Sequence, residues 1–481
     1  MKRAMVLTLV LFVLGLGGLA AVTLHLSRTQ EQVVFTNIVT RGDASAAQGL
    51  RMTEHDLLEE RVQWTTEHEL GTESRTTKTA FSGKELTYFY YGGELNEYVL
   101  CALVPDTEQV RTDLKELDED MDGEVTLQPA KYADYYSMCL TYDGVTGRTM
   151  LTETDRGSGG FTKDFPPLRI PVEEDDRLYM DVYGSGSGLQ YYCRFADVVN
   201  SFQPHDATVE AGTVVTVGFD AHVRPEADWA PEGFGLWLVG RAAEEEPQEY
   251  IKLVYPLDID RQRVVKLVTS PDRSRILLFL AEDGQLTQQV LRSDDFTLLQ
   301  TFSLGEIGVV ETEESCLYGS GQQEAVTRKL CYDTVLVRRG EDFFAVAVDK
   351  QLTVLQSGND GRLEKLFSCP MPDLYALVAA KGGFAYAWED EDVDPERILG
   401  TISPTRVDGG YGFETMSMAL RDGKLAMAWR DNTVGELDIM VEIFSEDGLE
   451  YARGIACGLY HQERGSVVLS ERRLPELVWA E

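Results

Sequence analysis

The stretch from Val264 to Leu304 decides the fold class. It reads VVKLVTS (264–270), PDRS (271–274), RILLFLA (275–281), EDG (282–284), LTQQVLRS (286–293), DDF (294–296) and TLLQTFS (297–303). Four runs rich in apolar residues alternate with short turns rich in Asp, Gly, Pro and Ser, which is typical of antiparallel strands joined by tight turns. The stretch therefore predicts one four-stranded antiparallel β-sheet.

Similar runs recur through the chain, and many successive ones start about 40 residues apart. They begin at Glu85 (ELTYFYYGG), Ser137 (SMCLTYDG), Arg177 (RLYMDVYG), Gly235 (GLWLVG), Arg275 (RILLFLAEDG), Asp342 (DFFAVAVDK), Phe384 (FAYAWED), Lys424 (KLAMAWRD) and Ser466 (SVVLSE). A period of this length with several short strands per unit indicates a β-propeller. We therefore predict an all-β chain whose main part is a propeller of about six to eight four-stranded blades. Two β-sandwiches in tandem are the competing architecture.

One blade carries a short motif that supports a family resemblance. Ser270-Pro271-Asp272 stands at its first turn. The chain here resembles secreted β-propellers of the WD40-like and TolB-like kind, whose blades often open with Ser-Pro-Asp. In pattern the resemblance extends over residues 80–475, although the Trp-Asp and Gly-His marks of WD40 repeats are absent. The resemblance implies a platform that binds a partner, and a fold alone does not assign a function.

The N-terminus predicts a membrane anchor. Ala4–Leu26 contains no charged residue and follows Lys2 and Arg3, and a helix over these 23 residues would span roughly 34 Å. The two cations predict a cytoplasmic stub at 1–3, a transmembrane signal anchor at 4–26 and an extracytoplasmic remainder. That remainder divides into a juxtamembrane segment (27–80) that leads into the first blade and a propeller-like domain (81–481). A cleaved signal peptide with Gly18 and Ala20 before the cut is the alternative.

The charge of the chain limits the partners that it can bind, and its cysteines bear on zinc binding and disulfide formation. The chain has 44 basic and 81 acidic residues, a net charge of −37, which disfavours nucleic acid and favours cations, basic peptides or amines as partners.

None of the seven cysteines forms a C-x-x-C pair, which argues against a zinc site. Cys316 and Cys331 flank a polar stretch that reads as a hairpin tip, and a disulfide between them is the alternative to buried thiols.

One motif indicates a metal. Residues 118–126 fit the first nine positions of an EF-hand loop, with Asp118, Asp120 and Asp122 as calcium ligands and Gly123 at the turn. Pro129 stands at the twelfth position, where the bidentate Glu belongs, so the predicted affinity is weak. The competing interpretation is an acidic hairpin tip. We expect no cofactor other than this calcium.

Signatures of catalysis are missing from the sequence. Gly184–Gly188 (GSGSG) reads as a turn after a strand, and the histidines have no metal-ligand spacing. Polar insertions that could carry function are Thr152–Pro167, Ala221–Gly233, Ala242–Glu249, Glu311–Lys329 and Glu389–Arg397.

We predict a membrane-anchored, non-catalytic binding or scaffold protein whose ligand is a protein, peptide or glycan. The alternatives are an extracytoplasmic hydrolase acting on glycans or peptides, and an accessory subunit of a membrane complex. In the second alternative Gly15, Gly17 and Gly18 would let another helix approach.

Overall fold

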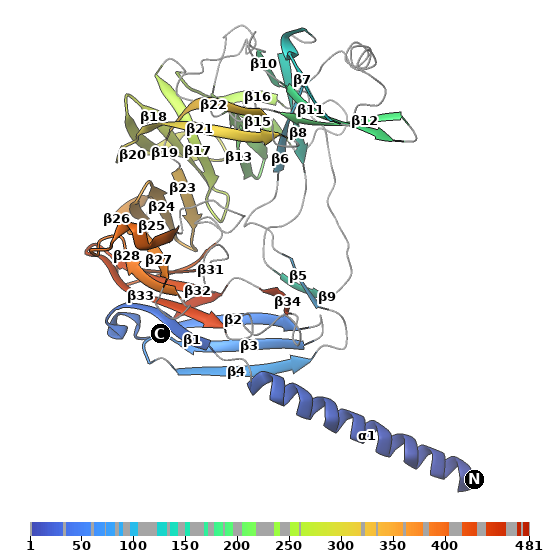
Figure 1. Ribbon diagram of the computed structural model, residues 1–481. Coiled ribbons are helices and arrows are strands. Elements are labelled where there is room, and N and C mark those ends of the chain that lie inside the picture. Colours follow the sequence, from blue (N-terminus) through green and yellow to red (C-terminus); the bar gives the residue numbers. More distant parts are fainter. Residues whose placement is uncertain are drawn as a thin grey trace.

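The structure is a computed structural model of the 481-residue chain. It describes residues 2–31, 35–58, 62–72, 74–81, 86–89, 97–103, 123–131, 135–142, 150–153, 168–171, 178–185, 188–195, 204–217, 235–240, 251–258, 261–318, 323–332, 335–358, 362–378, 384–403, 416–430, 439–457, 469–472 and 475–480. Antiparallel strands dominate these residues, and a single long helix stands at the N-terminus (Figure 1).

Three sheets in the middle of the chain are four-stranded meanders, in which each strand pairs with the next one in sequence. Their strands are β13 (Pro204–Val209), β14 (Gly212–Val217), β15 (Gly235–Gly240) and β16 (Ile251–Pro256); β17 (Gln262–Thr269), β18 (Arg275–Glu282), β19 (Gln285–Arg292) and β20 (Leu298–Glu306); and β23 (Val335–Arg339), β24 (Phe343–Val348), β25 (Gln351–Ser357) and β26 (Leu363–Pro370). The β17–β20 sheet is the one predicted from Val264–Leu304. Meanders of this kind are propeller blades, whereas a sandwich would need strands that cross between two facing sheets.

Other described strands form smaller sheets and hairpins. They are β5 (Leu86–Phe89) with β9 (Met150–Glu153); β6 (Glu97–Leu103), β8 (Tyr135–Tyr142) and β10 (Leu168–Pro171); β7 (Gly123–Leu127), β11 (Leu178–Ser185) and β12 (Gly188–Phe195); β21 (Val309–Tyr318) with β22 (Gln323–Tyr332); and β27 (Leu374–Val378), β28 (Phe384–Trp388) and β29 (Ile398–Ile402). Short 3₁₀ turns are η1 (Ala44–Ala47), η2 (Pro129–Lys131) and η6 (Pro395–Arg397).

The two ends of the chain are joined in two further sheets. The terminal sheet has the order β1-β33-β32-β31-β30, and in the N-terminal sheet β2 pairs with β3 and with both β34 and β35, while β4 lies at the edge. The strands are β1 (Phe35–Gly42), β2 (Leu50–Leu58), β3 (Val62–Glu69), β4 (Ser74–Phe81), β30 (Ser417–Arg421), β31 (Lys424–Arg430), β32 (Ile439–Ser445), β33 (Gly448–Cys457), β34 (Leu469–Arg472) and β35 (Glu476–Trp479). Early and late strands are therefore neighbours: β1 lies beside β33, and β2 lies beside β34, as Figure 1 shows.

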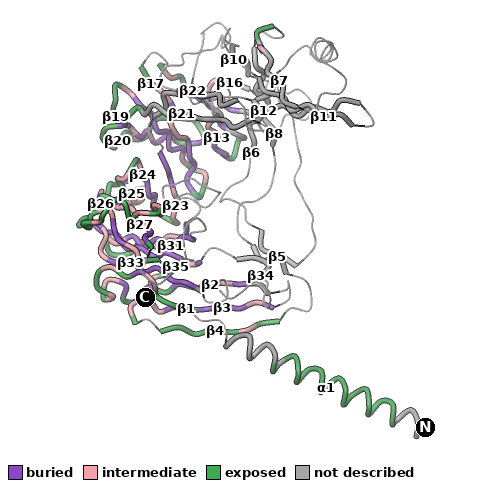
Figure 2. Tube along the Cα trace, in the orientation of Figure 1, coloured by how far each residue is buried: buried purple, intermediate pink, exposed green. Residues whose placement is uncertain are grey.

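Hydrophobic cores lie between sheets that follow one another in the chain. One core joins the β13–β16 and β17–β20 sheets, and a second joins the β17–β20 and β23–β26 sheets. A third joins the β23–β26, β27–β29 and terminal sheets, and a fourth joins the terminal and N-terminal sheets. The residues coloured as buried in Figure 2 accordingly lie along the strands of these sheets. Successive sheets that pack face to face are the arrangement expected of propeller blades.

The long helix α1 (Lys2–Glu31) begins two residues before the predicted anchor and ends five residues after it. It projects away from the strands in Figure 1, and its described side chains, at residues 6–22 and 24, are exposed in Figure 2. In the described part of the chain, no helix combines the length and the apolar character needed to cross a membrane.

The hairpin β21–β22 corrects one expectation from the sequence. Cys316 lies opposite Ala325, and Cys331 lies opposite Val310, so the two cysteines are six positions apart along β21. At about 3.3 Å per residue this separation is roughly 20 Å, far beyond the Cα distance of a disulfide. A Cys316–Cys331 disulfide is therefore wrong. The described parts of Glu311–Lys329, expected as a loop, lie in β21 and β22, which pair residue by residue.

Candidate functional site: buried charges between the terminal sheets

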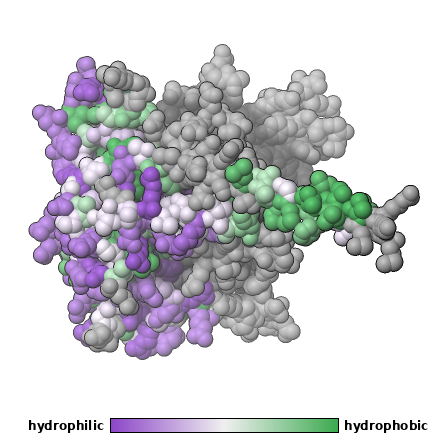
Figure 3. Space-filling model, turned by 90° about the horizontal axis from the view of Figure 1, so that it is seen from below, coloured by the Kyte–Doolittle hydropathy of each residue, from purple (hydrophilic) through white to green (hydrophobic). Residues whose placement is uncertain are grey.

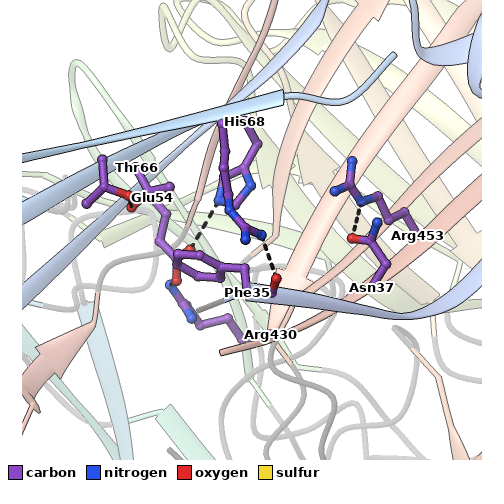
Figure 4. A network of polar contacts seen from close by, with 9 residues as sticks. Phe35, Asn37, Glu54, Thr66, His68, Arg430 and Arg453 are labelled. Atoms are coloured by element: carbon purple, nitrogen blue, oxygen red, sulfur yellow. Dashed lines mark hydrogen bonds and ion pairs between the residues drawn. The ribbon is translucent and has the colours of Figure 1, made fainter. Parts of the chain in front are cut away.

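A buried ion pair links the first and last parts of the chain. Arg430, at the end of β31, donates from Nη2 to Glu54 Oε1 of β2 at 2.9 Å (Figure 4). The exposed fraction of these side chains is 4% and 0%. His68 of β3 lies on the same face as Glu54, with its Nε2 at 3.6 Å from Glu54 Oε2. Charges buried to this degree are costly to desolvate and depend on their partners.

Strand β1 is fastened beside this pair. The ring of Phe35 stands edge-on to the His68 ring, with centroids 5.0 Å apart. Arg75 of β4 donates to the carbonyl oxygen of Phe35 and places its guanidinium over that ring, 5.7 Å from its centroid. Arg453 of β33 donates from Nε to Asn37 Oδ1 at 2.8 Å, which Figure 4 also shows. Polar contacts thus hold the strand that follows α1.

A second set of charges lies on the other face of the terminal sheet. Arg41 of β1 makes a bidentate contact with Asp390, with Nη1–Oδ1 and Nη2–Oδ2 distances of 2.8 and 2.6 Å. Its guanidinium also stacks over the Trp388 ring, 5.2 Å from the centroid. The hydrogen bond from Arg41 lowers the pKa of Asp390 below its usual range. Asp390 belongs to the acidic loop Glu389–Arg397, which is therefore partly tied to β1.

Lys350 joins two further carboxylates to this set. It forms ion pairs with Glu389, and with Asp373 Oδ2 at 3.3 Å. The Asp373 backbone N–H also donates to Glu389 Oε2 at 3.3 Å. The hydrogen bond from Lys350 lowers the pKa of Glu389, so this acid is anionic at neutral pH.

Glu442 of β32 is a buried carboxyl group in an apolar setting. It is 1% exposed, and Trp429 Nε1 donates to its Oε2 at 3.2 Å. Desolvation raises its pKa to about 7, the negative charge of Asp373 adds to the shift, and the Trp429 hydrogen bond opposes it. Glu442 is thus able to gain and lose a proton near neutral pH.

Together these groups hold sheets to one another. Glu54–Arg430 connects the terminal sheet with the N-terminal sheet, and Arg41–Asp390 connects the terminal sheet with the β27–β29 sheet. Each cation described above contacts a carboxylate, side-chain amide or carbonyl oxygen of another strand or turn, so the arrangement supports positioning of the sheets.

The predicted calcium ligands Asp118, Asp120 and Asp122 lie outside the described residues, so calcium binding stays a prediction. Gly123–Thr126, the later part of the motif, lies in β7, which pairs with β11. In the described ranges, no three acidic, His or Cys side chains converge as a metal site. In the predicted turn Gly184–Gly188, Ser185 ends β11 and pairs with Gly188, which begins β12, while residues 186–187 lie outside the described part of the chain.

The predicted insertions and histidines fall in different places. Thr152–Pro167, Ala221–Gly233 and Ala242–Glu249 lie wholly or mostly outside the described residues, as do His222 and His461. His55 contacts Thr65 and Gln63 within the N-terminal sheet. Burial, and then Lys266, lowers the pKa of His205 to about 3, which leaves its ring neutral at physiological pH. The structure does not bring the described histidines together.

Sequence reasoning missed Glu54, Arg430 and Glu442. Glu54 and Arg430 are separated by 376 positions, and no local motif marks either of them. One signal was present for Glu442, which stands in IMVEIFS, a run that is otherwise almost entirely apolar. A lone acid in a strand that is buried on both faces indicates a buried carboxyl group.

Comparison with known proteins gives a likeness in fold only. No protein family and no curated protein matches the chain. Among solved structures, TolB from Acinetobacter baumannii is similar with a TM-score of 0.22 and 10% identity, over 91% of this chain and 86% of that one. The Dos1 propeller has a TM-score of 0.24 and 8% identity, over 67% and 75% of the two chains. The Cps50 (Swd1) β-propeller domain from Myceliophteria thermophila has a TM-score of 0.19 and 7% identity, over 92% and 89%.

These solved structures include proteins of the class that the sequence pattern resembles, the β-propellers. All three TM-scores are low, so the likenesses carry no argument about function. The assignment of blades rests on the meanders and on the cores between them.

Proposed function

We propose that the protein is a membrane-tethered binding or scaffold protein, in which α1 is the anchor and the propeller-like sheets are an extracytoplasmic platform. The observation that carries the proposal is α1 itself. Its large apolar side chains are exposed from Val6 to Leu24, with exposed fractions from 47% for Val10 to 65% for Leu14 and Leu19. In Figure 3 this apolar helix projects from a body whose described surface is mainly hydrophilic.

An exposed apolar helix is costly in water and stable in a bilayer. The uncharged run Ala4–Leu26 supports a bilayer as its environment, and Lys2 and Arg3 support a cytoplasmic N-terminus. The described ion pairs between sheets support a platform in which neighbouring sheets are held to one another. With a net charge of −37, the platform favours basic proteins or peptides as partners.

Membrane association provides the test. We expect the full chain to stay in the membrane pellet after carbonate extraction and protease added to intact cells to degrade it beyond Ser27. A Leu11→Arg, Leu14→Arg double variant should move into the soluble fraction, because each cation at the centre of a span costs about 2.5–3.5 kcal/mol. The matched control is Thr29→Arg, which adds a cation beyond the uncharged run and should leave the protein in the pellet. Wild-type protein that is extracted by carbonate would refute the anchor.

A further inference from the structure

One face of the terminal sheet carries an acidic and a basic side chain in a single row across the strands. Glu442 of β32 lies opposite Ala452 of β33, and Ala452 lies opposite Arg41 of β1. Side chains directly opposite one another on neighbouring strands point to the same face. Only the methyl group of Ala452, which is 0% exposed, therefore separates Glu442 and Arg41 along this row.

More carboxylates than cations meet that face. The charged groups are Asp373 before β27; Glu389, Asp390 and Glu391 after β28; Lys350 after β24; and Glu442 and Arg41 of the terminal sheet. Lys350 is engaged by Asp373 and Glu389, and Arg41 is engaged by Asp390. Both cations thus already have carboxylate partners at the surface. Among the described residues, the indole N–H of Trp429 is the one donor to the buried acid Glu442.

We propose that this junction is a proton-linked latch: a protonated Glu442 lets the terminal sheet pack against the β27–β29 sheet, and loss of the proton loosens that contact. The anion would sit among Met427, Met440 and Trp429 in the apolar core, and it would face the negative charge of Asp373. A buried anion with one donor and a like-charged neighbour destabilises the packed state. Opening the contact lets water reach the carboxylate.

The proposed latch involves β1, the strand that follows α1 in the chain. Residues 32–34 alone separate the end of α1 from β1, and β1 carries Arg41. A junction that opens at higher pH therefore changes how firmly the segment after α1 is held. This inference does not depend on the proposed function, because it concerns packing between sheets and holds whether or not α1 lies in a membrane.

The direction in which pH changes the opening equilibrium follows from proton linkage. The pKa of Glu442 is about 7 when it is buried and 4.5 when it is in water. The closed state therefore binds the proton more tightly, and its advantage is complete below pH 4.5 and is lost as the pH rises through 7. Between pH 6 and pH 8 this linkage raises the equilibrium constant for opening about tenfold.

Amide hydrogen exchange of the full chain in detergent micelles tests the latch. Exchange of β1 and β32 is compared at pH 6 and pH 8 for the wild type, Glu442→Gln and the control Glu450→Gln, whose acid pairs with Lys424 on the same sheet. Comparing variants at one pH cancels the intrinsic pH dependence of exchange. We expect the extra tenfold opening in the wild type and in Glu450→Gln, and its loss in Glu442→Gln. An equal pH response in Glu442→Gln, or opening of the whole chain at once, would overturn the proposal.

A second variant keeps the test informative if Glu442→Gln does not fold. Asp373→Asn removes the negative neighbour that favours the protonated state of Glu442. Because the buried anion is then less destabilised, the increase in opening between pH 6 and pH 8 should be smaller in this variant than the tenfold increase in the wild type. An equal or larger increase in Asp373→Asn would place the titrating group elsewhere and refute the latch.

Discussion

Replacing Glu54 by Gln should lower the free energy of unfolding by about 3–5 kcal/mol, one of the two largest losses that we expect from a single substitution. The variant removes the carboxylate that Arg430 contacts at 2.9 Å. Neither side chain is more than 4% exposed, so water cannot replace the lost partner. The guanidinium keeps its charge at every accessible pH, so it stays buried beside a neutral amide. Chemical unfolding of the full chain in detergent, with the wild type measured in parallel, gives the difference.

The control is a matched substitution in an exposed ion pair of the same sheet. Glu67 of β3 pairs with Lys78 of β4 at 2.9 Å, with side chains 48% and 64% exposed. Glu67→Gln should destabilise the protein far less than Glu54→Gln does, because solvent screens such a pair. The Glu54→Gln, Arg430→Met double variant should be less destabilised than the sum of its single variants. Similar losses for Glu54→Gln and Glu67→Gln would show that burial does not govern the pair.

The strands could be predicted because their signal is local. GLWLVG at Gly235–Gly240 is β15, and RILLFLA falls within β18, because β-branched, aromatic and leucine residues alternate with turns of Asp, Gly and Pro at both ends. Ser270-Pro271-Asp272 forms the predicted turn through its side chains: Ser270 Oγ donates to Asp272 Oδ1 at 2.6 Å, and Asp272 accepts from the Ser274 N–H at 3.0 Å. Such contacts span only a few residues.

The joining of the chain ends was predicted only in outline. From the sequence, closure of a propeller ring predicts that a late strand near Val467–Leu469 pairs with Val33–Val39, because a closed ring leaves no unpaired edge. The structure instead pairs β1 with β33, and β34 with β2. The early and late strands are therefore paired as predicted in kind, but each has a different partner from the one predicted. Apolar alternation shows that a strand has a buried face, but many strands of this chain satisfy the same pattern. The choice among them depends on packing between sheets, which no short window contains.

The buried charges were the least predictable part. An Arg or Glu inside a strand is usually a solvated residue, and only the opposite sheet shows that Arg430 and Glu54 meet. Likewise Arg41-Gly42-Asp43 spells an adhesion tripeptide, yet Arg41 is held by Asp390, and Asp43 accepts a hydrogen bond from the Ser45 N–H at 2.9 Å. Each of these roles depends on neighbours that the local sequence does not specify.

Gly42→Ala should destabilise the protein by about 2–5 kcal/mol through the pairing of β1 with β33. Gly42 has φ of +77°, and a Cβ built there would lie 1.9 Å from the carbonyl oxygen of Glu450. The left-handed backbone accounts for about 1–2 kcal/mol, and forcing the two strands apart accounts for about 1–3 kcal/mol more. Because β1 follows α1, the loss should appear as increased amide exchange in β1 and β33 as well as in the unfolding midpoint.

Gly423 provides the matched control for this steric effect. It has φ of +74°, and a Cβ there would meet no atom within 4 Å. Gly423→Ala therefore carries the same backbone strain without the collision, and it should cost only about 1–2 kcal/mol. The difference between the two variants isolates the close approach of β1 to β33. Equal losses in both would mean that Glu450 moves aside at little cost, and that the first strand is held less tightly than its register indicates.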